Sequence, residues 1–341
     1  MAKRVAVIPG DGIGPEIVQA TMKVLEAMEL PIEFVRIEAG RRVWEETGKP
    51  VSEEDLETIK TCDAVLKGPI ETPVGPGTYR SVTVRIRKEL GLYANVRPVR
   101  SVPGLSQTQG VNMVIVRENT EGLYSGIEYR LTPDVAVTLR LTTRRGARRI
   151  CRFAFEYARR KGFRKVTAVH KANILKETCG LFLEEFRKAS QHYPEITPEE
   201  MHVDAAAYRL VVNPRQFEVI VTSNLFGDIL SDLAAGLTGS LGVAPSANVG
   251  DRHAMFEAVH GTAPDIAGKG IANPAGLMRS AAMMLEYLGF DDKASLLEKA
   301  VLEALKNTEA RTPDVGGSGN TETFTSEVLG LIRRGVLEGF C

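Results

Sequence analysis

Two aspartates stand four residues apart in the segment NLFGDILSD, which begins at Asn224 and has the pattern of a helix start. Residues four apart share one face of a helix, so the carboxylates of Asp228 and Asp232 point the same way. Such a pair repels unless a cation lies between its members, and hard oxygen ligands suit Mg²⁺ or Mn²⁺. Asp204, after the strand-like residues MHV, is a candidate third ligand. The alternative is an acidic pair that only complements the helix dipole.

A polar run, RENTEGLY, follows the strand-like segment Met113–Val116. Its Arg117 and Tyr124 have the chemistry to bind an anion and to transfer a proton. Arg117 could act with Arg87 and Arg97 to clamp carboxylates through paired hydrogen bonds, which lysine does less well. An ordinary surface loop with surface arginines is the alternative, and the residue types alone do not separate the two.

A lysine ends another strand-like segment, Val166–His170, in the run HKAN. A lysine at a strand end can act as a base when burial or nearby cations lower its pKa. An ion-paired surface lysine is the alternative interpretation of Lys171.

The turn GDGIG, from Gly10 to Gly14, follows a strand and precedes a helix, where a phosphate-binding turn would lie. Its GxGxG spacing differs from the dinucleotide-binding fingerprint GxGxxG. We therefore interpret it as a tight turn that packs the strand against the helix.

Strand-like and helix-like segments alternate along the chain, which predicts an α/β fold with a largely parallel sheet. The carboxyl ends of such strands are where active-site residues gather. The expected strands are Val5–Pro9, Ile32–Ile37, Cys62–Leu66, Met113–Val116, Val166–His170, a segment around Val203, and Phe217–Thr222. The expected helices are Pro15–Met28, Gly146–Lys161, Gly180–Ser190, Ile229–Gly236, Pro274–Leu288 and Ala294–Leu305. Two stretches, Lys67–Gly77 and Gly239–Asp251, are predicted to be irregular.

The bulk composition is that of an ordinary globular protein of two domains, with 341 residues, 43% hydrophobic and 25% charged. Lys plus Arg and Asp plus Glu both total 43, so net charge gives no reason to expect nucleic-acid or membrane binding. We interpret the arginines between Arg144 and Arg149 as a solvated helix face. No apolar run approaches the roughly 20 residues that span a bilayer. The four scattered cysteines and the absence of a signal-like start favour a cytoplasmic enzyme.

Six sequence blocks occur in a familiar order: PGDGIGPEI, LYANVRP, RENTEGLYSGIE, HKANI, NLFGDILSDLAAGL and HGTAPDIAGKGIANP. From about Val5 to about Phe324 the chain resembles the isocitrate, homoisocitrate and 3-isopropylmalate dehydrogenase family. The resemblance implies the two-domain fold of decarboxylating β-hydroxyacid dehydrogenases, which is not a standard Rossmann fold, with the active site in the interdomain cleft. Residues 1–98 and 250–341 would form the large cofactor-associated domain. Residues 99–249 would form a smaller dimerisation and catalytic domain.

The resemblance also implies a homodimer, or a higher oligomer, with shared active sites to which the partner subunit contributes Lys171 and Asp204. Tyr124 and Lys171 match the catalytic acid and base. The matching substrate-binding residues are Ser81, Thr83, Arg87, Arg97 and Arg117. The matching ligands for Mg²⁺ or Mn²⁺ are Asp204, Asp228 and Asp232.

Loops hold the cofactor in this family. The matching positions are Thr72, Asn173, His260, Gly261, Thr262, Ala263, Asp265, Ile266 and Asn273. A carboxylate at Asp265 can accept hydrogen bonds from a free ribose diol but repels a 2′-phosphate. NADP-using relatives resemble this segment with Lys-Tyr in place of Asp265-Ile266, so NAD⁺ is the expected cofactor.

The expected reaction is the oxidative decarboxylation of isocitrate to 2-oxoglutarate, because the loop KGPIETPVG resembles isocitrate dehydrogenases. Isocitrate enzymes resemble Ser-x-Asn-x-x-x-Arg in the next helix. Ser81 and Arg87 fit this pattern, whereas Thr83 stands where asparagine is expected, so homoisocitrate is the close alternative and 3-isopropylmalate the third. Arg85 would lie roughly 200° around the helix from Arg87 and would not face the same substrate. A non-catalytic regulatory subunit is disfavoured because the catalytic residue types are all present.

Overall fold

A ten-stranded mixed sheet runs through the molecule in the computed structural model, which describes residues 2–75 and 77–335. The strand order is β2-β1-β3-β12-β11-β4-β5-β10-β8-β9, and β6 and β7 form a separate hairpin. The strands are β1 (Lys3–Ile8), β2 (Ile32–Arg36), β3 (Ala64–Lys67), β4 (Ala94–Arg100), β5 (Asn112–Glu118), β6 (Glu128–Thr132), β7 (Val135–Thr138), β8 (Lys165–His170), β9 (Thr197–His202), β10 (Val219–Thr222), β11 (Pro245–Val249) and β12 (Ala254–Ala258).

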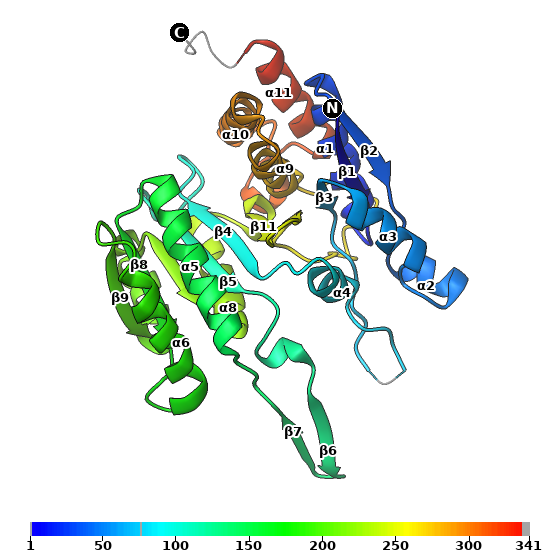
Figure 1. The fold of residues 1–341 in the computed structure, drawn as a ribbon. Helices are drawn as coiled ribbons and strands as arrows, with labels where there is room; N and C mark the ends of the chain where they lie inside the picture. Colours follow the sequence, from blue (N-terminus) through cyan, green and yellow to red (C-terminus); the bar gives the residue numbers. More distant parts are fainter. Residues whose placement is uncertain (1, 76, 336–341) are drawn as a thin grey trace.

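Helices pack on both faces of this sheet (Figure 1). They are α1 (Gly14–Ala27), α2 (Arg41–Thr47), α3 (Glu53–Thr61), α4 (Val82–Glu89), α5 (Arg144–Lys161), α6 (Lys176–Ser190), α7 (Val203–Val212), α8 (Asn224–Thr238), α9 (Ala275–Tyr287), α10 (Asp291–Ala304) and α11 (Thr321–Arg333). Among the described residues, none of these helices is both long and apolar enough to cross a bilayer.

The predicted α/β class is confirmed, but the sheet is parallel only at its two ends. In the middle, β12, β11, β4 and β5 pair antiparallel. The two central strands β4 and β11 lie side by side, and the predicted domain boundaries, after Pro98 and after Val249, fall within β4 and at the end of β11. The chain therefore leaves the first half of the sheet and returns to it through neighbouring antiparallel strands.

One predicted strand is shifted and one predicted irregular stretch is wrong. The strand expected around Val203 exists as β9, but it ends one residue earlier at His202, and Val203 begins α7. The stretch Gly239–Asp251, predicted to be irregular, contains a short 3₁₀ turn and β11. The small residues of β11 are buried against α9. Because few of them are β-branched or aromatic, the sequence gives no clear strand pattern at this place.

Helix α5 forms where the sequence places a cap and an apolar stripe. The side chain of Thr143 accepts a hydrogen bond from the backbone N–H of Gly146, and Gly162 ends the helix with φ of 76°. The charged face of α5 is paired rather than freely solvated, since Arg144 and Arg148 both bind the buried Glu185 of α6. Although burial opposes ionisation of Glu185, these partners lower its pKa to about 2.

The hairpin of β6 and β7 projects away from the body of the molecule (Figure 1). It exposes large apolar side chains, and α7 and α8 expose others. The exposed residues are Ile127, Tyr129, Leu131, Val135, Leu139 and Leu141 in and beside the hairpin, and Tyr208, Val211, Val212 and Ile229 on the two helices. An isolated two-stranded hairpin is only marginally stable in water, and apolar surface of this extent is typical of an interface.

The turn after β1 is tight, as predicted, and it supports two distant loops. The backbone N–H of Asp11 donates to the carbonyl of Pro69 at 2.7 Å, and that of Ile13 donates to the carbonyl of Thr262 at 2.9 Å. A methyl group on Gly12 would come within 2.0 Å of the Thr262 oxygen. Asp11 extends the contact, because one carboxylate oxygen accepts from the N–H of Glu71 at 2.9 Å.

We therefore expect Gly12→Ala to destabilise the protein through two effects. The φ of +58° costs about 1–2 kcal/mol for a side chain, and the clash with Thr262 adds about 1–3 kcal/mol. Gly162→Ala is the matched control, because Gly162 has φ of +76° and nothing lies within 4 Å of its added methyl. Denaturant unfolding measures both variants, and equal losses of unfolding free energy would contradict the close packing of the turn on Thr262.

Candidate active site

Two buried arginines meet the aspartate pair of α8: Arg97 comes from the middle of β4, and Arg117 comes from the carboxyl end of the antiparallel neighbour β5. Arg97 donates to Asp228 at 3.2 Å and to Asp232 at 3.0 Å. Arg117 donates to the same Asp228 oxygen and, at 2.7 Å, to the side-chain oxygen of Asn224. The structure thus brings four of the predicted site residues together, and the pairing of both aspartates with one guanidinium confirms that they face the same way.

Tyr124 joins this cluster from the short 3₁₀ turn Leu123–Ser125. Its hydroxyl donates to Asp228 at 2.5 Å, and the Arg117 guanidinium lies 5.0 Å from its ring centre. Burial, followed by the bond to Asp228, raises the pKa of Tyr124, which therefore keeps its proton at neutral pH. A phenol in this state can act as a proton donor.

The glycine of the NLFGD motif explains how the helix approaches so closely. A methyl group on Gly227 would lie 2.6 Å from Cβ of Arg117. Burial works against the charge of Asp228, but Arg117, Tyr124 and Arg97 outweigh it and lower the pKa of Asp228. Burial and the nearby Arg97 lower the pKa of Arg117 to about 10, which leaves it cationic at neutral pH.

The two carboxylates of α8, Asp228 and Asp232, are suitable ligands for a hard divalent cation, but they are only part of a complete metal site. Both carboxylates already converge on a cation, the guanidinium of Arg97, and the side chain of Asp232 is 51% exposed. Within the described part of one chain, however, no group of three His, Cys, Asp or Glu side chains gathers around a common point. One chain therefore brings two carboxylates together here, those of Asp228 and Asp232.

Arg87 lies on α4 with its guanidinium buried between the helix and β12. It donates to Glu257 at 2.8 Å, and Lys67 at the end of β3 binds the other oxygen of Glu257 at 2.8 Å. Lys67 thus belongs to a buried strand rather than to the irregular loop predicted to begin there. Burial opposes the charge of Glu257, but the two cations hold its pKa well below its usual range. The Arg87 Nε is buried and has no hydrogen-bond partner among the described residues.

Three further residues of interest lie in α4 or just before it, namely Arg85, Ser81 and Thr83. Arg85 binds Glu53 at 2.7 Å on the outer side, so the prediction that it faces away from Arg87 is confirmed. Ser81 caps the helix by accepting from the N–H of Val84 at 3.3 Å, which leaves its hydroxyl proton free for a ligand. Thr83 lies half-buried two residues further on.

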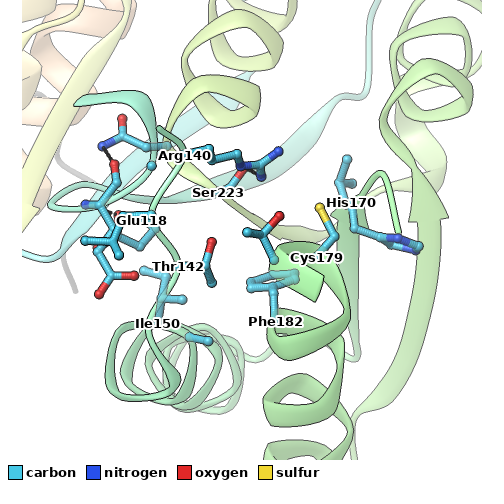
Figure 2. Close-up of a pocket in the computed structure, with 15 residues that line it drawn as sticks. Glu118, Arg140, Thr142, Ile150, His170, Cys179, Phe182 and Ser223 are labelled. Atoms are coloured by element: carbon cyan, nitrogen blue, oxygen red, sulfur yellow. Dashed lines mark hydrogen bonds between the residues drawn. The ribbon is translucent and has the colours of Figure 1, made fainter. Parts of the chain in front are cut away.

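Lys171 and Asp204 form a separate pair, 2.6 Å apart, at the ends of β8 and β9. Their side chains are 27% and 67% exposed, so within one chain Lys171 is an ion-paired surface lysine. Its backbone N–H donates to the sulfur of Cys179 at 3.4 Å. A cavity of about 30 Å³ adjoins this contact; Figure 2 shows Glu118 and Ile150 across it from Cys179.

The predicted cofactor residues lie in separate loops: the segment of Thr262 contacts the turn after β1, whereas Asn173 follows β8 towards the other end of the sheet. Thr72, Asn173, Gly261 and Asp265 are exposed, and Ala263 has a positive φ of 38°, which is a strained backbone for alanine. The Nε2 atom of His260 is buried and has no hydrogen-bond partner among the described residues.

Asn273 is more deeply buried than the other predicted cofactor residues. It donates to Asp314 at 3.0 Å and accepts from the backbone N–H of Ala275. Sequence reasoning missed Asp314, because it lies in a short 3₁₀ turn far along the chain from the motifs it supports. It also missed Glu257 and Asp11, whose roles depend on contacts between segments 60 or more residues apart.

Comparison with known proteins gives a consistent result. Residues 4–330 match the family model described as isocitrate/isopropylmalate dehydrogenase. The chain is 48% identical to a 3-isopropylmalate dehydrogenase of Archaeoglobus fulgidus, over 97% of this chain and 99% of the relative. It is 45% identical to a probable NAD isocitrate dehydrogenase subunit alpha, mitochondrial, of Caenorhabditis elegans, over 97% of this chain and 92% of the relative. The crystal structure of isocitrate dehydrogenase from Methylococcus capsulatus superposes with a TM-score of 0.94 at 47% identity, covering 97% of this chain and 99% of that one.

Proposed function

The chain belongs to the isocitrate/isopropylmalate dehydrogenase family and is a decarboxylating dehydrogenase, and we propose that it oxidises isocitrate to 2-oxoglutarate with NAD⁺ and Mg²⁺ or Mn²⁺. The observation that carries the choice of substrate is the polar character of α4. Ser81 offers a free hydroxyl proton and Arg87 a buried, unpartnered Nε, whereas an isopropyl group would need apolar lining at these positions. Homoisocitrate is the alternative, because Thr83 is shorter than the asparagine expected there.

The residues of the chain have different roles in this proposed reaction. Arg87, Arg97 and Arg117 bind the substrate carboxylates through charge-assisted hydrogen bonds. Lys171 accepts the proton of the substrate hydroxyl as the adjacent carbon is oxidised, and Tyr124 donates a proton to the carbon that loses CO₂. The raised pKa of Tyr124 suits this role. Asp228 and Asp232 would hold a divalent ion, which would supply Lewis-acid polarisation of the substrate hydroxyl and the neighbouring carboxylate.

We further propose that two subunits share each active site. In one chain the pair of Lys171 and Asp204 is separate from the cluster of Arg97, Asp228 and Asp232. Because one chain supplies two carboxylates at α8, Asp204 of the partner subunit completes the metal site. The exposed apolar residues of the β6–β7 hairpin, α7 and α8 support a dimer, since they would be buried between two copies.

We also propose that the chain is divided into two domains. Residues 1–98 and 250–341 form the cofactor-associated domain, residues 99–249 form the dimerisation and catalytic domain, and substrate binds in the cleft between them. The exposed residues Thr72, Gly261 and Asp265, which are predicted to bind the cofactor, all belong to the first of these domains.

A cytoplasmic location is supported by the buried free thiols of Cys62, Cys151 and Cys179; Cys341 lies outside the described residues.

A panel of substrates tests the proposed reaction. With NAD⁺ and Mg²⁺ we expect isocitrate to give the highest kcat/KM, and homoisocitrate to follow within about 10–200-fold, because one methylene contributes modest discrimination. We expect 3-isopropylmalate to be poorer by roughly 10⁴-fold, since its apolar group leaves buried polar partners unpaired. Activity should disappear in excess EDTA and return with Mg²⁺. If 3-isopropylmalate has the highest kcat/KM, the substrate proposal is wrong, and full turnover in EDTA would refute the metal.

Subunit mixing tests the shared site. Lys171→Ala and Tyr124→Phe chains, each inactive alone, should recover about a quarter of wild-type activity after exchange, because half of the dimers are mixed and each mixed dimer has one intact site. Each variant exchanged with itself is the control. Proven mixed dimers without activity would mean that both residues act within one chain.

The cofactor preference depends on Asp265 and Ile266. We expect kcat/KM to favour NAD⁺ over NADP⁺ by roughly 100-fold, because the Asp265 carboxylate repels a 2′-phosphate. The double change Asp265→Lys with Ile266→Tyr should reduce this ratio strongly. Asp292→Asn, which removes an exposed carboxylate from α10, should leave it unchanged. Equal use of both cofactors by the wild type would exclude this role for Asp265.

A further inference from the structure

The carboxylate of Asp11 joins two segments that lie far apart in the sequence. One of its oxygens accepts from the backbone N–H of Arg41, the first residue of α2, at 2.9 Å. The other oxygen accepts from the backbone N–H of Glu71 at 2.9 Å. An ionised carboxylate offers two acceptor oxygens and no donor, so aspartate can bind both N–H groups, whereas the amide of asparagine could bind one of them.

The backbone before α2 packs tightly around this carboxylate. A methyl group on Gly40 would lie 2.5 Å from each of the two Asp11 oxygens, and the φ of Gly40 is +120°. Glycine therefore leaves the room that the carboxylate occupies, and the carboxylate has little freedom to move.

Glu71 is held from two further directions. Its carbonyl oxygen accepts from the hydroxyl of Tyr79 at 3.0 Å. Its own carboxylate pairs with the guanidinium of Arg41 at 3.3 Å. Thr72 follows directly and is exposed. Glu71 is thus a fixed point at the base of the segment that presents Thr72.

The place of Thr72 in the chain indicates which half of the cofactor it meets. Under the proposed function the nicotinamide ring takes hydride from a substrate carbon, so this ring lies beside the substrate. The segment of Thr72 leads to Ser81, a proposed substrate residue at the start of α4. Asp265, by contrast, is proposed to bind the ribose of the adenosine half. Thr72 therefore belongs to the nicotinamide half of the cofactor site.

We propose that Asp11 is a positioning residue for the nicotinamide half of NAD⁺, because its carboxylate holds Glu71 and thereby sets where Thr72 meets the cofactor. This role rests on the proposed function in one respect, namely that Thr72 binds the cofactor. Asp11 acts through the backbone of Glu71 rather than by contact with the cofactor.

The same turn is bonded to the segment of Thr262, but through a different group. There the backbone N–H of Ile13 donates to the Thr262 carbonyl at 2.9 Å. A change confined to the side chain of Asp11 weakens the hold on Glu71 and leaves the bond between Ile13 and Thr262 in place. The two halves of the cofactor site can therefore be tested separately.

The test is Asp11→Asn, which keeps the size of the side chain but turns an NH₂ group towards one of the two N–H donors. The matched control is Asp63→Asn. Asp63 lies at the other end of β1, where it also accepts from a backbone N–H, that of Arg4, at 2.8 Å. Calorimetry gives the dissociation constants of NADH and of ADP-ribose, which lacks the nicotinamide ring. Steady-state kinetics give the KM values of NAD⁺ and isocitrate.

For Asp11→Asn we expect the dissociation constant of NADH to rise about 10-fold, because a hydrogen bond to a charged group typically contributes a factor of about 10 or more. The dissociation constant of ADP-ribose should change less than about 2-fold, and the KM should rise for NAD⁺ but not for isocitrate. Asp63→Asn should change none of these values, even where it lowers the free energy of unfolding. An equal loss of affinity for NADH and ADP-ribose, or an unchanged affinity for NADH, would overturn the proposal.

Two further measurements keep the result decisive. If Asp11→Asn fails to fold, judged by circular dichroism, Tyr79→Phe removes the hydroxyl bonded to the Glu71 carbonyl and must weaken NADH more than ADP-ribose. Because the binding measurements need no substrate acid, they decide the role of Asp11 even if isocitrate is not the substrate. If the wild type binds no NADH, the proposed cofactor fails by itself. NADPH and 2′-phospho-ADP-ribose are then compared in the same way, and an unchanged ratio of their dissociation constants overturns the positioning role.

Discussion

The central constraint on this molecule is the burial of cationic side chains inside a sheet. Lys67, Arg87, Arg97 and Arg117 are all nearly inaccessible, and a buried charge is strongly destabilising unless it is paired. The fold meets this requirement with Glu257 for the first two cations and with the α8 aspartates for the other two. Strands β3, β4, β5 and β12 and helices α4 and α8 must therefore keep fixed relative positions.

The antiparallel centre of the sheet makes this arrangement possible. It puts β4 and β11 next to each other, so residues more than 150 positions apart, such as Asn95 and Asn248, become cross-strand partners. A purely parallel sheet would need a crossover connection at this point. The same strands connect the two halves of the molecule, and the buried cations lie on these strands or beside them.

The α/β class, most strands and the pairing of Asp228 with Asp232 could be predicted from sequence, because periodicity and spacing are local properties. The strand β11 could not, since its residues are small and its pairing depends on segments far away in the chain. Arg97, Arg117 and Tyr124 could be proposed from their types, but their convergence on Asp228 depends on the approach that Gly227 allows. Glu257, Asp314 and Asn248 carry no local signature, because each is defined by partners brought by other strands or turns.

The turn after β1 has a consequence for how cofactor use can change over evolutionary time. Its backbone is in contact with the carbonyls of Pro69 and Thr262, at the bases of two of the loops that carry the predicted cofactor residues. Changes in the path of either loop would disturb the first strand and helix, so the loop backbones have little freedom to drift. Asp265 lies beyond this anchored part and is exposed. With the role proposed for Asp265, new dinucleotide preferences are most accessible through side-chain replacement at this exposed position, while the loop backbone stays unchanged.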